Sequence, residues 1–211
     1  MNADLFDINL NDVKTEVFQD SVIYTVDNFY KYPNDVLALI ESNKPKLWKS
    51  WQTPSYNGSY FEDYRHDFID ARFNTVTAAL ENICKQPASE STSITTNKIK
   101  FKDYYFNDYF NYYWAPHNDF GYTGIVYFES SGTNLYERLE EDLFTENEHV
   151  APWRPKSKYK KIKTLEAKFN RMILFDGQKF LHGMDIDNDL FFKKYRLNQA
   201  IFFIYQNELA Q

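Results

Sequence analysis

Most of the strand-forming residues of this chain come late, in short runs separated by turn-like residues. After about residue 97 the sequence contains IKFKDYYF, DYFNYYW, YTGIVYFES, KFNRMILFD and RLNQAIFFIY. Aromatic residues, which make up 19% of the chain, and β-branched residues dominate these runs and favour pleated, half-buried surfaces. Several short strands of this kind must bury their apolar sides against one another, which predicts an antiparallel, sheet-rich body.

The first 97 residues have a different pattern. SVIYTVDNF (Ser21–Phe29) alternates apolar residues in the manner of a strand. A helix is expected from Pro33, because proline stands in its first turn and Asp35 lies near its N-terminus. A second, longer helix is expected from about Asp67, where apolar residues recur at helical spacing through FIDARFNTVTAALENICK.

These observations predict one domain of 211 residues with an α+β, mostly β fold. Residues 1–97 would form a strand and helix support, and residues 98–211 an antiparallel sandwich or jelly roll with the helices packed on one outer face. The polar stretch Gln86–Asn97 reads as a loop. The charged segment from about Leu139 to Leu165 reads as a long insertion near the mouth of a site.

Charge and cysteine content narrow the class of protein. The net charge of −6, from 24 basic and 30 acidic residues, argues against tight binding of a phosphate backbone. The single Cys84 permits no internal disulfide, which suits a reducing compartment. The N-terminus lacks the apolar core of a secretory signal, and no apolar run is long enough to span a bilayer. We expect a cytoplasmic protein that acts on a small molecule or peptide, without a signal for nucleic acid, membrane or a particular oligomeric state.

A candidate metal site lies in APHNDFG. On an extended chain His117 and Asp119 point to the same side, because side chains alternate with a period of two. His182, which follows the strand-like run RMILFDG, is expected to supply a third ligand. Two imidazoles and one carboxylate leave coordination positions open, as in mononuclear non-haem iron(II) oxygenases. An H-x-D pair is common by chance on protein surfaces, so the downstream residues decide the interpretation.

Arg196 is the most informative downstream residue. It begins an apolar run, and a guanidinium is costly to bury unless an anion meets it. Its planar fork matches a carboxylate and stays charged at any working pH. If iron binds a 2-oxo acid through its keto and carboxylate oxygens, Arg196 would bind the far carboxylate, and Asn198 on the same face could add a hydrogen bond. The alternative is a salt bridge from Arg196 to one of the nearby acids, Asp185, Asp187 or Asp189.

The sequence resembles the iron(II)- and 2-oxoglutarate-dependent dioxygenase superfamily, and looks closest to its prolyl-4-hydroxylase-like branch. The opening VIYTVDNFYKYPNDVLALI also resembles the strand and helix that precede the barrel in small oxygenases of that branch. The strongest matching covers about Tyr104–Glu129 and Phe169–Tyr205. It rests on four motifs in a fixed order, namely HND with His117 and Asp119, IVYFE with Tyr127, LHGM with His182, and RLNQAIFF with Arg196.

The resemblance implies a double-stranded β-helix (a jelly-roll core) in which Fe(II) is ligated by His117, Asp119 and His182. Arg196, helped by Tyr127, would bind the distal carboxylate of 2-oxoglutarate. The implied reaction consumes O2 and 2-oxoglutarate, releases succinate and CO2, and hydroxylates a C–H bond of a substrate. The carboxylate of Asp119 favours hydroxylation over halogenation, since related halogenases have a small residue there.

The chain departs from the family pattern at two points. Asn198 stands where the family commonly has Ser or Thr, and the step of fourteen residues from His182 to Arg196 is long.

Two alternative functions stay open at this stage. One is a nucleobase-directed oxygenase of the same superfamily, which a basic groove would favour. The other is a catalytically silent jelly-roll protein with a binding or structural role.

Overall fold

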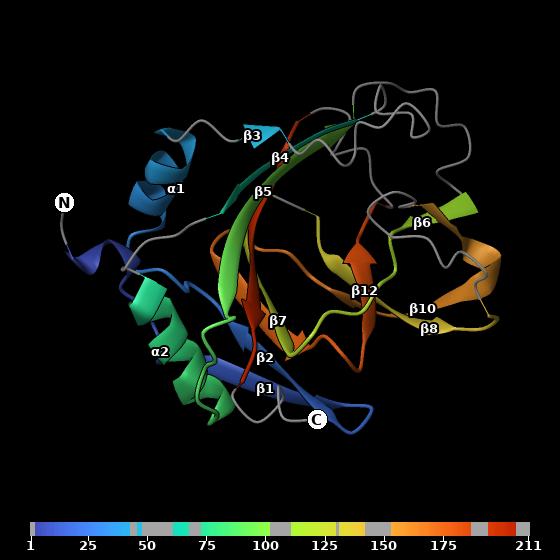
Figure 1. Cartoon of the computed structure of the whole chain (residues 1–211), viewed down its shortest axis with the longest axis horizontal. Helices are drawn as coiled ribbons and strands as arrows, with labels where there is room; N and C mark the ends of the chain where they lie inside the picture. The colour runs from blue at the N-terminus through green and yellow to red at the C-terminus, as the bar shows by residue number, and fades with distance from the viewer. Residues whose placement is uncertain are drawn as a thin grey trace.

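The computed structural model describes residues 3–42, 46–47, 61–67, 73–101, 111–129, 131–141, 153–186 and 194–205. Within these ranges the chain is mostly β, with antiparallel sheets and two α-helices (Figure 1). This confirms the predicted α+β, mostly β class. None of the helices in the described ranges has the length and apolar character needed to cross a membrane.

The elements alternate only near the N-terminus, after which strands follow one another. The helices are α1 (Pro33–Ser42) and α2 (Phe73–Cys84), with short 3-10 helices η1 (Ala3–Phe6) and η4 (Lys156–Lys158). The strands are β1 (Val13–Phe18), β2 (Ser21–Val26), β3 (Lys46–Leu47), β4 (Phe61–Asp67), β5 (Ser93–Phe101), β6 (Tyr112–Trp114), β7 (Tyr122–Glu129), β8 (Thr133–Arg138), β9 (Trp153–Pro155), β10 (Tyr159–Leu165), β11 (Arg171–Asp176), β12 (Leu181–Met184) and β13 (Arg196–Phe203).

Within the described residues the strands form three sheets, whose central pairings join strands that are far apart in sequence. The large sheet has the order β1-β2-β11-β7-β13-β5-β4-β3, so that β7 and β13 lie at its centre. A second sheet has the order β10-β8-β12, and β6 pairs with β9 in a third. In Figure 1 the helices lie on one side of the large sheet, and β8, β10 and β12 lie on the other.

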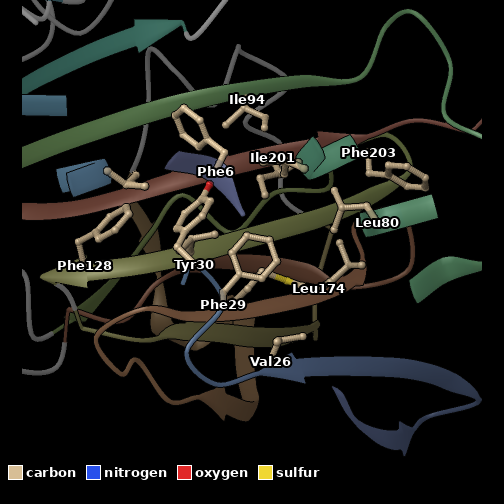
Figure 2. Packing of buried hydrophobic residues seen from close by; sticks show 14 of the residues in the cluster. Phe6, Val26, Phe29, Tyr30, Leu80, Ile94, Phe128, Leu174, Ile201 and Phe203 are labelled. Carbon is tan, nitrogen blue, oxygen red and sulfur yellow. The ribbon is translucent and has the colours of Figure 1, made fainter. Parts of the chain in front are cut away.

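The helices cover the large sheet through one apolar cluster (Figure 2). Side chains of a strand alternate between the two faces, so β7 sends Val126 and Phe128 to this side and Ile125 and Tyr127 to the other. Burial of large apolar side chains is the main stabilising term of such a layer. The cluster joins both helices to the sheet through Phe6, Val26, Phe29, Tyr30, Val36, Ile40, Val76, Leu80, Ile83, Ile94, Val126, Phe128, Met172, Leu174, Leu197, Ile201 and Phe203.

The opposite face of the large sheet packs on the second sheet. Ile125 and Tyr127 of β7 and Phe175 of β11 form a second buried cluster with Leu135 of β8 and Leu165 of β10. The space between these two sheets is therefore filled on one side by apolar side chains. The candidate ligand His182 packs against Phe175 of that cluster.

Two boundaries expected in the first half of the chain differ from the structure. The second helix is present but begins at Phe73, and Asp67, its expected start, is the last residue of β4 (Phe61–Asp67), which pairs with β5. The expected loop Gln86–Asn97 contains the start of β5, because the β-branched residues of SITTN fit a pleated strand despite their polarity. Residues 68–72 lie outside the described ranges.

The predicted insertion from about 139 to 165 is also wrong for its second half. Residues 159–165 form β10, which pairs antiparallel with β8 and belongs to the second sheet. Tyr159 and Leu165 are buried, whereas Lys160 and Lys161 are exposed. Lysine is well tolerated on an edge strand, which explains how a charged sequence joins a sheet. Residues 142–152 lie outside the described ranges.

Candidate metal centre

Backbone pairing brings the two histidines together. His117, which follows β6, and His182 of β12 form an isolated antiparallel bridge. The amide of His117 donates to the carbonyl of His182 at 3.0 Å, and the amide of His182 donates to the carbonyl of His117 at 2.8 Å. Directly opposed residues have neighbouring side chains, and the ring centroids lie 4.5 Å apart. The position of the predicted third ligand is thus set by two main-chain hydrogen bonds.

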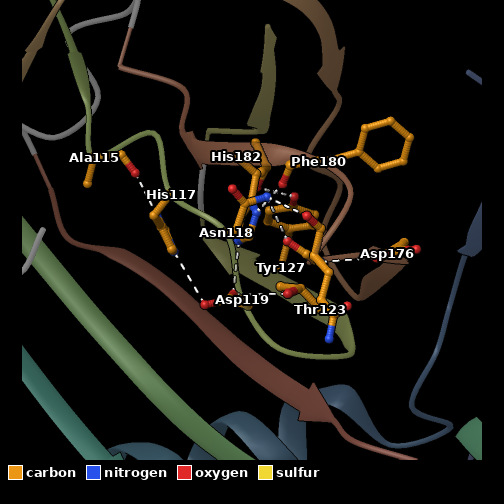
Figure 3. A network of polar contacts seen from close by, with 12 residues as sticks. Ala115, His117, Asn118, Asp119, Thr123, Tyr127, Asp176, Phe180 and His182 are labelled. Carbon is orange, nitrogen blue, oxygen red and sulfur yellow. Dashed lines mark hydrogen bonds and ion pairs between the residues drawn. The ribbon is translucent and has the colours of Figure 1, made fainter. Parts of the chain in front are cut away.

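Asp119 completes the group (Figure 3). Its amide donates to the carbonyl of Gly177 at 3.0 Å, which fixes the loop before β7. Its carboxylate Oδ2 lies 3.0 Å from Nε2 of His182, and Oδ1 lies 3.6 Å from Nε2 of His117. One ligand atom from each of the three residues lies within 4.8 Å of the others. The structure therefore brings together the three residues that the sequence predicted as ligands.

Both imidazoles have one nitrogen occupied. Nδ1 of His117 lies 2.5 Å from the carbonyl of Ala115, and Nδ1 of His182 lies 3.0 Å from the carbonyl of Phe180. A carbonyl only accepts, so each Nδ1 serves as the donor in these contacts, and Nε2 is the nitrogen of each ring that points to Asp119. This use of the second nitrogen orients the histidines of metal sites in general. His182 is also held edge-on against the ring of Phe175, with centroids 4.9 Å apart.

Asp119 is ionised in this setting. Burial alone would raise the pKa of its carboxyl group, but the hydrogen bond and the charge of His182 lower that pKa, and His117 and Thr123 add to the effect. The net result is a pKa well below the usual range of an aspartic acid. The centre therefore combines one anionic oxygen donor with two imidazoles, each of which can offer Nε2 to a metal once that nitrogen is unprotonated, and such a set suits a divalent cation.

A cavity of about 280 Å³ opens beside the three residues and lies between the two sheets. Every second residue of β13, from Arg196 to Phe202, lines it, while Leu197, Ile201 and Phe203 face the helices. Its wall is otherwise largely apolar and aromatic. The lining residues are Asn97, Ile99, Trp114, Ala115, His117, Asp119, Thr123, Ile125, Thr133, His182, Gly183, Met184, Arg196, Asn198, Ala200 and Phe202.

Arg196 is buried in this cavity and has no ion-pair partner among the described residues. It is 4% exposed, and its Nε has no hydrogen-bond partner. Burial lowers its pKa to about 10, so the guanidinium still carries its charge at neutral pH. No carboxylate within the described ranges lies at ion-pair distance from it, although the charge of Asp185, which accepts from Nδ2 of Asn134 at 3.2 Å, raises the pKa of Arg196. Asp187 and Asp189, the other acids considered for a salt bridge, lie outside those ranges.

Asn198 and Tyr127 are placed differently with respect to the cavity. Asn198 lines it, is 2% exposed, and has an Oδ1 without a partner. Tyr127 is fully buried behind the wall, where its hydroxyl lies 2.7 Å from Oγ1 of Thr133. Thr133 lines the cavity, so Tyr127 reaches it through this threonine rather than directly.

Sequence reasoning missed Asn97 and Thr123. Asn97 lies directly opposite Asn198 in the pairing of β5 with β13, and its Oδ1 also lacks a partner. Thr123 donates through its hydroxyl to Oδ2 of Asp119 at 2.9 Å. Neither position has a local sequence signal. The place of Asn97 depends on strand register, and the contact of Thr123 with Asp119 depends on the course of the loop before β7.

Comparison of this sequence with protein-family models and with curated proteins gives no match.

Proposed function

We propose that this protein is an iron(II)- and 2-oxoglutarate-dependent dioxygenase that hydroxylates a C–H bond of a small-molecule or peptide substrate. One observation carries the proposal. A buried arginine that has no ion-pair partner among the described residues lies in the same cavity as a His-Asp-His group whose Nε2 and carboxylate atoms converge.

The donor set supports Fe(II). Two neutral imidazoles and one carboxylate form the facial triad found in non-haem iron(II) oxygenases, with positions left open for further ligands. His117, Asp119 and His182 would hold the metal here, because both Nδ1 atoms are already bound to carbonyls and both Nε2 atoms face the carboxylate. When bound, Fe(II) supplies the activation of O2 that is coupled to conversion of 2-oxoglutarate into succinate and CO2.

Arg196 supports a dicarboxylic 2-oxo acid as the co-substrate. A 2-oxo acid group can chelate a metal, and a second carboxylate at the far end would satisfy the guanidinium, whose burial is otherwise costly. Asn198 and Asn97 lie opposite each other on β13 and β5 beside Arg196. An amide can turn either its Nδ2 or its Oδ1 to a ligand, so both residues can add hydrogen bonds to that end.

The chain's own residues would bind and orient the reactants. Arg196 would fix one end of the co-substrate, and Thr133 would be held in place by Tyr127. The apolar side chains of Trp114, Met184 and Phe202 would exclude water around the reacting groups. Asp119 would stay ionised as a ligand and take no proton in the reaction.

Strand order supports a jelly-roll, or double-stranded β-helix, assignment for the core. The segment β11-β7-β13-β5 of the large sheet faces β10-β8-β12, and the bridge between His117 and His182 continues the second sheet towards β6. Eight strands in two facing antiparallel sheets are what a jelly roll requires. In such a core the metal ligands would lie between the sheets, where the cavity opens.

The cavity wall also bears on the substrate and on the place of action. Within the described residues, Arg196 is the only lysine or arginine that lines it, which disfavours the nucleobase-directed alternative because a basic groove is missing from this wall. We propose the cytoplasm as the location, since a reducing environment keeps Cys84 as a thiol and iron in its divalent form.

The test is the formation of succinate from 2-oxoglutarate by protein loaded with Fe(II) in air. Wild type should release succinate, and Asp119→Ala should fall to the level of Fe(II) in buffer. Asp7→Ala, which removes a surface carboxylate paired with Lys31, should behave as wild type. A wild-type protein that neither binds metal nor releases succinate would contradict the proposal and favour the catalytically silent jelly-roll protein.

A further inference from the structure

The carboxylate of Asp119 has a hydrogen bond that does not come from the two histidines. Thr123, in the second position of β7, donates from Oγ1 to Oδ2 of Asp119 at 2.9 Å. Thr123 is 2% exposed and lies in the cavity wall. Because a strand residue has a stiff backbone and threonine is restricted at χ1, this hydroxyl is a fixed donor.

Gly177 makes that contact possible. A Cβ at this position would lie 2.4 Å from Oγ1 of Thr123 and 3.1 Å from Cβ of Asp119. The carbonyl of Gly177 also accepts from the amide of Asp119 at 3.0 Å and from Nδ2 of Asn118 at 3.2 Å. Its own amide donates to the carbonyl of Gly121 at 2.8 Å. The turn after β11 thus clamps the backbone of the loop that carries Asp119 and leaves room for one hydroxyl.

We propose that Thr123 is a positioning residue of the metal centre, and that Gly177 is required for its action. The inference rests on the proposed function: Thr123 would fix the orientation of the Asp119 carboxylate about its Cβ–Cγ bond. Without the Thr123 hydroxyl the carboxylate rotates about its Cβ–Cγ bond, and its oxygens no longer keep their direction towards both Nε2 atoms. Such supporting contacts to a metal ligand are worth about 10- to 100-fold in metal affinity.

Direct measurement of metal binding tests this role without turnover. The probe is Co(II), which takes the same nitrogen and oxygen donors as Fe(II) and has visible d–d bands that report on coordination geometry. Thr123→Val removes the hydroxyl at nearly constant shape and should raise the Kd for Co(II) about tenfold and change the d–d spectrum. Thr123→Ser restores the donor and should return both towards wild type. Gly177→Ala should reproduce the Thr123→Val spectrum, because the added methyl displaces the hydroxyl.

Thr164→Val is the matched control. Thr164 lies on β10, its hydroxyl donates to Oδ1 of Asn134 at 2.7 Å, and neither residue lines the cavity. This variant should bind Co(II) as wild type does. Thermal unfolding of the metal-free variants confirms that each one is folded, and Thr123→Val retains a β-branched residue that suits a strand.

The outcomes separate the two proposals. Failure of the wild-type protein to bind Co(II) would overturn the proposed function together with this inference. Binding by wild type with an unchanged Kd and spectrum in Thr123→Val would overturn the inference alone. Equal weakening in Thr123→Ser and Thr123→Val would also overturn it, because the donor would then be irrelevant.

Discussion

Arg171 and Arg196 lie on the same sheet in opposite electrostatic situations. Arg171 of β11 donates from Nε and Nη2 to the two carboxylate oxygens of Asp27, at 2.6 and 3.2 Å. Arg196 of β13 is more deeply buried, its Nε has no partner, and no carboxylate of the described ranges pairs with it. Arg171 forms an ion pair with Asp27 of the same chain, and this pair stabilises the fold. Arg196 has no ion-pair partner among the described residues and lines the cavity beside the three candidate ligands.

Replacement of Arg196 should give the largest effect. Arg196→Met removes the partner of the co-substrate carboxylate and should weaken 2-oxoglutarate binding by about 2–5 kcal/mol, as expected for loss of a buried charged contact. The free energy of unfolding without ligand should stay the same or rise, because an uncompensated buried charge is removed. Calorimetric titration of the Co(II)-loaded protein and urea unfolding measure the two quantities. A large loss of stability with unchanged binding would make Arg196 a structural residue.

Arg171→Met should show the reverse pattern with a smaller magnitude. Its loss leaves the carboxylate of Asp27 without its bidentate donor and should lower the free energy of unfolding by about 1–3 kcal/mol. Affinity for 2-oxoglutarate should not change, because Arg171 does not line the cavity. The same two measurements apply, and weakened co-substrate binding in this variant would erase the distinction between the arginines.

Asn97→Ala tests whether a neutral amide beside Arg196 also contributes to binding of 2-oxoglutarate. Loss of one amide beside Arg196 should weaken 2-oxoglutarate binding by about 1 kcal/mol, the usual worth of a hydrogen bond. Thr96→Val is the control, since Thr96 directly precedes Asn97 on β5, is also buried, and does not line the cavity. Calorimetry on both variants checks the result. Equal affinities in Asn97→Ala and wild type would remove Asn97 from the site.

The pairing of Arg171 should appear in the pH dependence of stability. The hydrogen bond from Arg171 lowers the pKa of Asp27 from 3.8 to about 2. A carboxyl group with a lowered native pKa stabilises the fold fully above its unfolded pKa, and that contribution is lost as the pH falls from about 4 to 2. Because the pair is partly exposed, we expect about 1 kcal/mol or less.

Asp27→Asn provides the comparison for this measurement. Wild type should be more stable than the variant at pH 5, and the difference in free energy of unfolding should vanish towards pH 2. A difference that stays constant over this range would mean that the ion pair does not contribute.

The strands and helices that sequence predicted are those with a clear apolar period. Both helices and the central strands β7, β11 and β13 present regular apolar faces, so local pattern was sufficient. The strands β4 and β10 were missed because their sequences, FEDYRHD and YKKIKTL, are charged. Their place in a sheet depends on pairing with β5 and β8, which is a long-range property.

The candidate site divides in the same way. His117, Asp119 and His182 could be predicted because each carries a donor suited to iron, and Arg196 because a charge in an apolar run demands an anion. Asn97 could not, because its position opposite Asn198 depends on strand register. The role of Tyr127 beside the co-substrate came from the family resemblance, whereas its hydroxyl lies 2.7 Å from Oγ1 of Thr133, on a strand that was not predicted.

The most direct test is an anaerobic titration of the protein with Fe(II) and then with 2-oxoglutarate. We expect a visible charge-transfer band that grows as 2-oxoglutarate is added, whose final intensity corresponds to one iron per protein chain. The band should be absent in Asp119→Ala. A folded wild-type protein that gives no such band would contradict the proposed iron and 2-oxoglutarate site.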